Sequence, residues 1–228
     1  MIGPSDGAAM RPALLSAGFA ALLLGAATPL RAQWDLRLEV PRPSGQSLPQ
    51  TLISGTGQLA SGGLDTGRGT IVSVNRQLFQ IGPLFRMEAG VEYSQWKADG
   101  TLVQGGAVQG TALKQQGAGV GLNAQLWVPF VGLAGEIGVI QRFQRYTFDT
   151  SGLSNAKDLT RTWLRVGARW RLPLPGIHPY LAASYQQPIT KDHPVQLASA
   201  ADLAGYFTAQ GNGQEFERLW TFGVGVAF

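Results

Sequence analysis

The 228-residue chain has no cysteine, only two histidines, and few charged residues, which make up 14% of the sequence. Without cysteine, the chain has no disulfide, no thiolate metal site and no cysteine nucleophile. Neither His178 nor His193 has a second histidine at ligand spacing. We therefore expect no metal site and no other cofactor.

The chain also has few long apolar runs. The main one is the uncharged segment Pro12–Ala27, which follows Met10-Arg11 and precedes small residues up to Ala32. A basic start, an apolar centre and a small-residue cleavage site are the three parts of a secretory signal peptide. The alternative is a membrane anchor, but the run is short for a spanning helix of about 20 residues.

This segment divides the chain into two parts. We predict a signal peptide over residues 1–32 and a single exported domain over residues 33–228. Two details stay open, because cleavage after Ala27 and a start at Met10 both fit the pattern.

The rest of the chain has apolar residues at alternate positions, and the last nine residues show this most clearly. Large apolar side chains occupy Trp220, Phe222, Val224, Val226 and the terminal Phe228, with small or weakly polar residues between them. A period of two indicates a β-strand whose two faces differ.

The same alternation predicts eight strands. They are Trp34–Val40, Thr70–Phe79, Phe85–Lys97, Gly117–Val128, Leu133–Phe148, Thr160–Leu172, His178–Ile189 and Gln214–Phe228. We expect Pro41 and Pro43 to end the first strand, because proline cannot donate to a ladder. The connections alternate between long and short, which is typical of transmembrane up-and-down barrels with short periplasmic turns and long outer loops. The four long polar loops would be Pro41–Gly69, Ala98–Gln116, Asp149–Leu159 and Lys191–Gly213.

The C-terminal pattern ending in Phe228 resembles the last strand of bacterial outer-membrane β-barrels. In architecture the domain is similar to the small eight-stranded OmpA/OmpX/opacity-type barrel family. The resemblance implies an all-β fold, a single eight-stranded antiparallel up-and-down transmembrane β-barrel, in the outer membrane of a Gram-negative bacterium. It also implies contact with outer-membrane lipid and recognition of the last strand by the outer-membrane assembly machinery. No functional residue carries over from the family.

Alternation alone does not decide which face of the wall is inside, because a soluble lipocalin-type barrel would enclose the apolar face. The signal peptide, the terminal aromatic residue and the loop lengths favour the membrane version. The lumen would then be lined by Asp35, Arg37, Glu39, Arg86, Glu88, Glu92, Glu136, Arg142, Arg165, Arg169, Arg171, Glu215 and Glu217.

We expect these charges to fill the lumen as ion pairs. Eight strands enclose a space just wide enough for side chains. An isolated buried charge costs several kcal/mol, and the arginine fork suits bidentate pairing with carboxylates. Glycines in Gly117–Gly121 would give the long side chains room on the same face.

Three functional hypotheses follow. The first is a non-enzymatic structural or surface-interaction protein whose loops face the outside and offer a surface for an extracellular ligand. The second is transport of small molecules across the outer membrane, through a narrow channel in the lumen or by a lateral gap for small apolar molecules. The third is a lipid-modifying enzyme, although the sequence shows no clear set of nucleophile, base and orienting group.

Two other motifs point to no further function. The Asp65-Thr66-Gly67 triplet occurs once, whereas aspartic-protease chemistry needs two carboxylates, so we interpret it as a turn. The formal charge of +4 comes from scattered residues, so we expect no nucleic-acid partner.

Overall fold

The computed structural model describes residues 33–43, 46–128, 130–150, 153–174, 178–190, 196, 198, 199, 202, 206 and 218–228. The predicted signal peptide, most of the segment 191–213, and Glu215 and Glu217 lie outside the described residues. The ten strands are β1 (Trp34–Pro43), β2 (Gln46–Ile53), β3 (Gln58–Leu64), β4 (Arg68–Ile81), β5 (Phe85–Gln104), β6 (Ala107–Val128), β7 (Leu133–Thr150), β8 (Leu153–Arg171), β9 (His178–Pro188) and β10 (Leu219–Ala227). In the described part of the chain, no helix is long and apolar enough to cross a bilayer.

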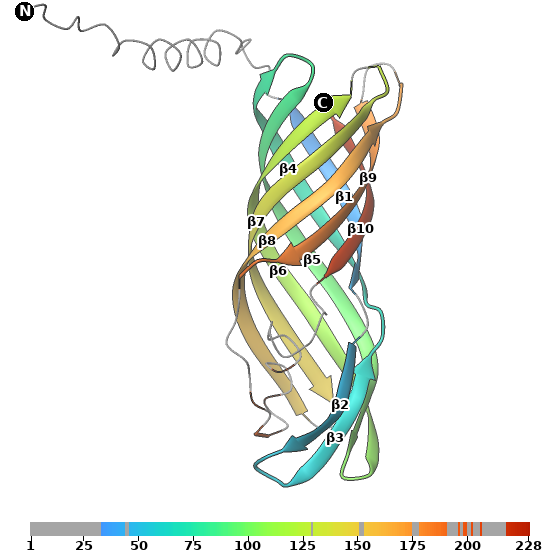
Figure 1. The fold of residues 1–228 in the computed structure, drawn as a ribbon, viewed down its shortest axis with the longest axis vertical. Coiled ribbons are helices and arrows are strands. Elements are labelled where there is room, and N and C mark those ends of the chain that lie inside the picture. The colour runs from blue at the N-terminus through green and yellow to red at the C-terminus, as the bar shows by residue number, and fades with distance from the viewer. Residues whose placement is uncertain are drawn as a thin grey trace, which may run out of the picture.

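Eight of these strands form a closed antiparallel ring in the order β1-β4-β5-β6-β7-β8-β9-β10, with β10 pairing back to β1 (Figure 1). The closing ladder pairs Asp35–Pro43 with Leu219–Ala227, and backbone hydrogen bonds in both directions between Trp34 and Phe228, with N–O distances of 2.8 and 2.9 Å, extend it. The predicted eight-stranded up-and-down barrel is therefore confirmed. We call the end with the short turns the periplasmic end, following the arrangement of transmembrane barrels.

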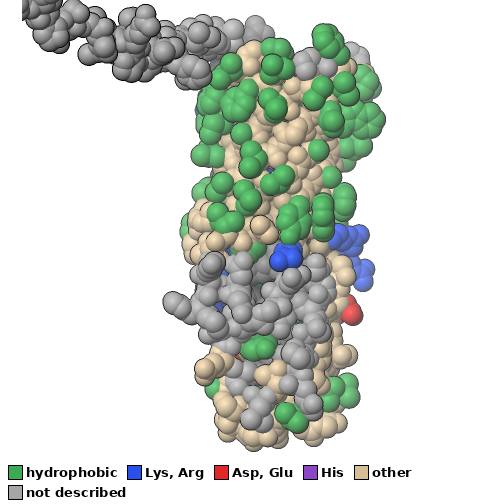
Figure 2. Space-filling view, in the orientation of Figure 1, with side chains coloured by type: hydrophobic (Ala, Val, Ile, Leu, Met, Phe, Trp, Pro, Cys, Tyr) green, Lys and Arg blue, Asp and Glu red, His purple; other side chains and the backbone are tan. Residues whose placement is uncertain are grey.

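The apolar face of the wall points outward over the periplasmic half of the barrel. Val91 and Ile137 are 57% and 53% exposed, whereas Arg37 and Glu39 on the inner face are fully buried. Figure 2 shows hydrophobic side chains gathered over the upper part of the molecule, which is the end that carries the C-terminus in Figure 1. An apolar outer belt around a closed, fully paired wall suits a hydrocarbon surrounding.

The first strand is longer than the sequence predicts, because β1 continues through Pro41 to Pro43. The pairing explains why the prolines do not end it. β1 pairs with β4 only as far as Glu39, whereas it stays paired with β10 up to Pro43. Beyond Glu39 one side of β1 is therefore free of ladder bonds, and a proline is tolerated on such an edge.

Three segments predicted as polar loops contain regular strands, which corrects that expectation. Within 41–69, β2 and β3 form a hairpin, and β3 pairs with the end of β5. Within 98–116, β5 and β6 continue to a tight turn at Gly105-Gly106. Within 149–159, β7 and β8 pair as far as Thr150 and Leu153. These extensions project far from the periplasmic end, in the lower half of Figure 1.

In the projecting part, apolar side chains lie inside and charged side chains lie outside, which is the reverse of the arrangement in the membrane belt. Its interior holds a hydrophobic cluster of Ile53, Ala60, Leu64, Trp96, Ala98, Leu102, Leu113, Tyr146 and Phe148. The rings of Trp96 and Tyr146 lie 5.9 Å apart in an edge-to-face arrangement. On the outer face, Lys97 and Lys114 are exposed and form ion pairs. Water surrounds this part, so burying apolar side chains inside it is the stable arrangement.

Candidate functional site: the charged lumen

Three strands carry pairs of like-charged lumen residues, and the spacing within each pair is the same. β1 carries Asp35 and Glu39, β5 carries Glu88 and Glu92, and β8 carries Arg165 and Arg169. In each pair the residues are four positions apart, an even spacing that keeps both side chains on one face of a strand. Each strand thus projects two like charges into the lumen at two levels.

The two β8 arginines bridge the acidic strands on both sides of them. At the periplasmic level, Arg169 contacts Asp35 Oδ2 at 3.1 Å and Glu88 Oε2 at 3.2 Å. At the next level, Arg165 contacts Glu39 Oε2 at 3.2 Å and Glu92 Oε2 at 3.1 Å. Because β1 and β5 each lie three strands from β8 around the ring, each arginine spans most of the bore.

Glu136 on β7 joins the two levels. It accepts a bidentate contact from Arg37, with N–O distances of 2.9 and 2.8 Å, and a third hydrogen bond from Arg169 Nε at 2.5 Å. Bidentate contacts between an arginine and a carboxylate are among the strongest and most directional in proteins. Arg142, also on β7, contacts Glu92 and donates to Gln186 Oε1 at 2.6 Å.

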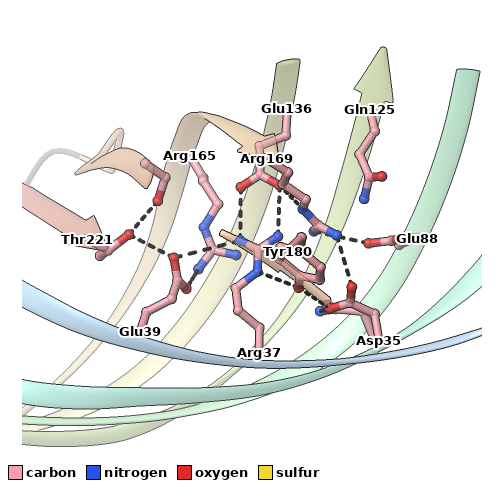
Figure 3. A network of polar contacts seen from close by, with 12 residues as sticks. Asp35, Arg37, Glu39, Glu88, Gln125, Glu136, Arg165, Arg169, Tyr180 and Thr221 are labelled. Atoms are coloured by element: carbon pink, nitrogen blue, oxygen red, sulfur yellow. Dashed lines mark hydrogen bonds and ion pairs between the residues drawn. The ribbon is translucent and has the colours of Figure 1, made fainter. Parts of the chain in front are cut away.

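Neutral side chains complete the hydrogen bonding of the carboxylates (Figure 3). Tyr180 donates to Asp35 at 2.7 Å and accepts from Arg37 Nε at 3.2 Å. Thr221 donates to Glu39 at 2.8 Å, and its hydroxyl lies 2.6 Å from that of Ser184. Buried carboxylates need such partners for their remaining lone pairs. The sequence reasoning did not name these residues, although all of them lie on the inward phase of their strands.

Glycines on the inner face make room for the network. A Cβ at Gly225 would lie 2.2 Å from the Tyr180 ring, and one at Gly119 would lie 3.2 Å from Arg142 Cγ. The first distance is far below van der Waals contact, so the Tyr180 ring occupies space that only a glycine leaves free. Arg161 is a further buried inward arginine that the sequence reasoning did not name.

Most of the predicted lumen residues meet in this network. Those brought together are Asp35, Arg37, Glu39, Glu88, Glu92, Glu136, Arg142, Arg165 and Arg169. Arg86 lies at its edge, 4.0 Å from Glu88. Arg171 does not join it and instead lies over the Trp127 ring at the periplasmic rim, because it is the last residue of β8.

The side chains of the predicted C-terminal assembly signal lie on the outer wall. Trp220, Phe222, Val224 and Phe228 are exposed toward the surroundings of the barrel, and Val226 is half-buried. The ring of Trp220 packs against Tyr185 of the neighbouring strand, with centroids 5.1 Å apart. This strand therefore contributes its apolar face to the belt.

The lumen has the chemistry of a filled interior. Its carboxylates are engaged by arginines, and among the described residues no group of three or more His, Asp or Glu side chains could hold a metal ion. His178 lies at the periplasmic start of β9, opposite Ala227. Networks of paired, hydrogen-bonded charges of this kind rigidify a protein interior.

No family model matches the sequence, and no curated protein matches it. Several solved structures are similar in fold. Neisserial surface protein A is 11% identical over 85% of this chain and 95% of its own, with a TM-score of 0.45. The attachment invasion locus protein Ail of Yersinia pestis, solved with the heparin analogue sucrose octasulfate, is 12% identical over 87% of this chain and 100% of its own, with a TM-score of 0.46. The outer membrane protease OmpT of Escherichia coli is 10% identical over 88% of this chain and 96% of its own, with a TM-score of 0.38.

The identification rests on the geometry of the chain itself. The wall is closed, its outward face is apolar over the periplasmic half, and its charges are buried and paired inside. These three features together are those of a transmembrane barrel and not of a soluble one. The chain is an eight-stranded β-barrel of the outer-membrane type.

Proposed function

We propose that the chain is a non-enzymatic, closed barrel of the outer membrane that presents a rigid surface to the outside. The observation that carries this proposal is the pair formed by Arg37 and Glu136. These residues stand on β1 and β7, which are four strands apart in either direction around the ring. Their bidentate contact therefore joins opposite walls, which supports a lumen closed at that level.

Further layers support the closed state. Arg165 and its two carboxylates form a second charged layer beside the first. Next along the axis, Ile140, Trp163 and Leu219 form an apolar layer. A buried charge left without its partner costs about 3–5 kcal/mol, so these layers favour the closed state. This argues against the narrow-channel hypothesis.

The projecting strands support the role at the surface. They have a hydrophobic cluster of their own, so they form a rigid platform rather than plain solvated loops. Binding residues usually lie on segments held by such a scaffold. We assign to this platform the contact with an extracellular ligand or surface, and we regard a lipid-modifying activity as unsupported by the lumen chemistry.

Export and assembly belong to the same proposal. Residues 1–32 would direct export and be removed, leaving residues 33–228 as the barrel. The outward apolar side chains of β10 and of the terminal Phe228 that follows it would be recognised by the outer-membrane assembly machinery. Their exposure on the strand that closes the ring supports this assignment.

Planar-bilayer recording of the purified, folded barrel tests the closed lumen. We expect no stable conductance steps above those of the protein-free bilayer. Folding is checked on the same sample by the shift in gel mobility between unheated and boiled protein. Regular, long-lived open steps from folded protein would contradict the proposal and favour the narrow channel.

A further inference from the structure

A cavity of about 550 Å³ lies at the periplasmic mouth of the barrel. It is bounded by the turns that follow β4, β6 and β8, and its lining includes Gln80, Arg86, Trp127, Phe130, Trp170 and Arg171. The charged network described above ends just inside it, at Glu88. Neither arginine of this cavity is needed to join the walls of the barrel.

Arg86 is buried but poorly partnered. Its side chain is only 10% exposed, and the nearest carboxylate, Glu88, is 4.0 Å away. Glu88 already engages Arg169 at 3.2 Å through its other oxygen. Within the described part of the chain, the Nε of Arg86 has no hydrogen-bond partner. A buried guanidinium group with so little compensation calls for an anion.

Arg171 adds a second cation to the same cavity. Its guanidinium carbon lies 4.4 Å from the centroid of the Trp127 ring, and that of Arg86 lies 5.7 Å from the same centroid. The indole N–H of Trp127 donates to Gln125 at 3.1 Å, which helps to hold the ring near both arginines. Among the described residues, no carboxylate lies within ion-pair distance of Arg171. The cavity thus concentrates positive charge next to one aromatic ring.

The walls of the cavity indicate what kind of anion fits. Val128 and Trp170 line it and also belong to the exposed apolar face that contacts lipid. The cavity therefore opens at the boundary between hydrocarbon and water, where tryptophan side chains are favoured. A ligand that fits has an anionic head for the arginines and an apolar tail for the outer wall.

We propose that Arg86 and Arg171 bind the phosphate of an anionic phospholipid in the periplasmic leaflet, with an acyl chain lying along Val128 and Trp170. The planar donor array of arginine matches phosphate oxygens, and two arginines can share one phosphate. The bound phosphate supplies the charge compensation that Glu88 does not. This proposal rests on the membrane location of the barrel and not on the closed lumen.

Native mass spectrometry of the folded barrel, released from detergent in the presence of dioleoyl phosphatidylglycerol, tests this site. Parallel samples contain dioleoyl phosphatidylcholine or inorganic phosphate alone. We expect one phosphatidylglycerol to bind preferentially, and the double variant Arg86→Gln/Arg171→Gln to bind it at least about tenfold more weakly, because it loses the charge-assisted contacts to the phosphate. Arg145→Gln is the matched control, since Arg145 is an exposed arginine on the projecting part of the barrel and does not line the cavity. Its affinity should stay within about twofold.

Three results would overturn the proposal. The first is equal binding of phosphatidylglycerol by the wild type and the double variant. The second is equal retention of phosphatidylcholine and phosphatidylglycerol by the wild type. The third is binding of inorganic phosphate without lipid, which would identify a free-anion site. If the double variant fails to fold, the single variant Arg171→Gln at the half-buried rim position provides the same comparison, with an expected loss of at least about threefold.

Discussion

Arg37 and Glu136 meet across the full width of the barrel, from diametrically opposed strands, with N–O distances of 2.9 and 2.8 Å. The ring of backbone hydrogen bonds fixes each strand to its neighbours, but this pair fixes opposite walls to each other. Stability and closure should therefore depend on the same few side chains.

Glu136→Gln should destabilise the barrel strongly. The substitution removes the carboxylate shared by Arg37 and Arg169 and leaves two buried guanidinium groups undercompensated. We expect a loss of about 3–5 kcal/mol in the free energy of unfolding, measured by urea titration in lipid vesicles. The matched control is Asp99→Asn, which breaks an exposed pair with Lys97 and should cost less than about 1 kcal/mol. Equal effects of the two substitutions would contradict the assigned role of Glu136.

Gly225→Ala should disturb the network through Tyr180. The new Cβ would overlap the Tyr180 ring, so the hydroxyl must leave Asp35 and Arg37 or the backbone must shift. We expect a loss of about 1–3 kcal/mol in the same unfolding measurement. Gly135→Ala is the control, because a Cβ at that lipid-facing position meets no atom within 4 Å. A Gly225→Ala variant as stable as this control would show that the ring does not occupy that space.

Leu113→Ala should loosen the projecting part and spare the membrane belt. Leu113 is fully buried in the hydrophobic cluster of that part. The cavity left behind costs about 2–5 kcal/mol, which acts locally because the charged layers lie elsewhere. In intact cells, we expect faster protease cleavage of the projecting strands with unchanged heat-dependent gel mobility. Val108→Ala, at a position 72% exposed, should leave cleavage unchanged; cleavage rates alike in both variants would contradict this.

The stabilisation provided by Asp149 on the projecting surface should depend on pH. Hydrogen bonds from Lys114 and Ser154, both 2.6 Å long, hold the pKa of Asp149 below its usual value. Because the folded-state pKa is lowered, this stabilisation is present above the usual carboxyl pKa and is lost as the pH falls through the folded-state value. Lys114→Gln should raise the pKa of Asp149 toward its usual value in a carbon-detected NMR titration. An unchanged pKa in that variant would show that the contact is absent in solution.

The closed ring and the inward charges are predictable from the sequence, because a period of two assigns every residue of a strand to one face. The inward placement of Glu88 and Glu92 follows from the same alternation that places Val91 outward. The partners across the lumen are not predictable in this way. The contact between Arg37 and Glu136 depends on the stagger of strands around the closed ring, which alternation does not encode.

The projecting strands escape prediction for a different reason. Along β5 the outward apolar residues Val91 and Tyr93 are odd-numbered, whereas the inward apolar residues Trp96 and Ala98 are even-numbered. The strand leaves the membrane between them, so its apolar residues change face and the alternation breaks. From the sequence we end this strand at Lys97 and expect a loop from Ala98, because the segment that follows is rich in glycine and glutamine. The change of face instead marks the passage from lipid to water.

Nitroxide labelling tests the central claim most directly, namely that the apolar face of the wall contacts lipid while the charges lie inside. The chain has no cysteine, so Val91→Cys, Ile137→Cys and Lys97→Cys each give a single label. In lipid vesicles, labels at the first two positions should relax with dissolved oxygen and hardly at all with a water-soluble nickel chelate. The label at Lys97→Cys should show the reverse. Labels at Val91→Cys and Ile137→Cys that are shielded from both reagents, or reached mainly by the nickel chelate, would contradict the account.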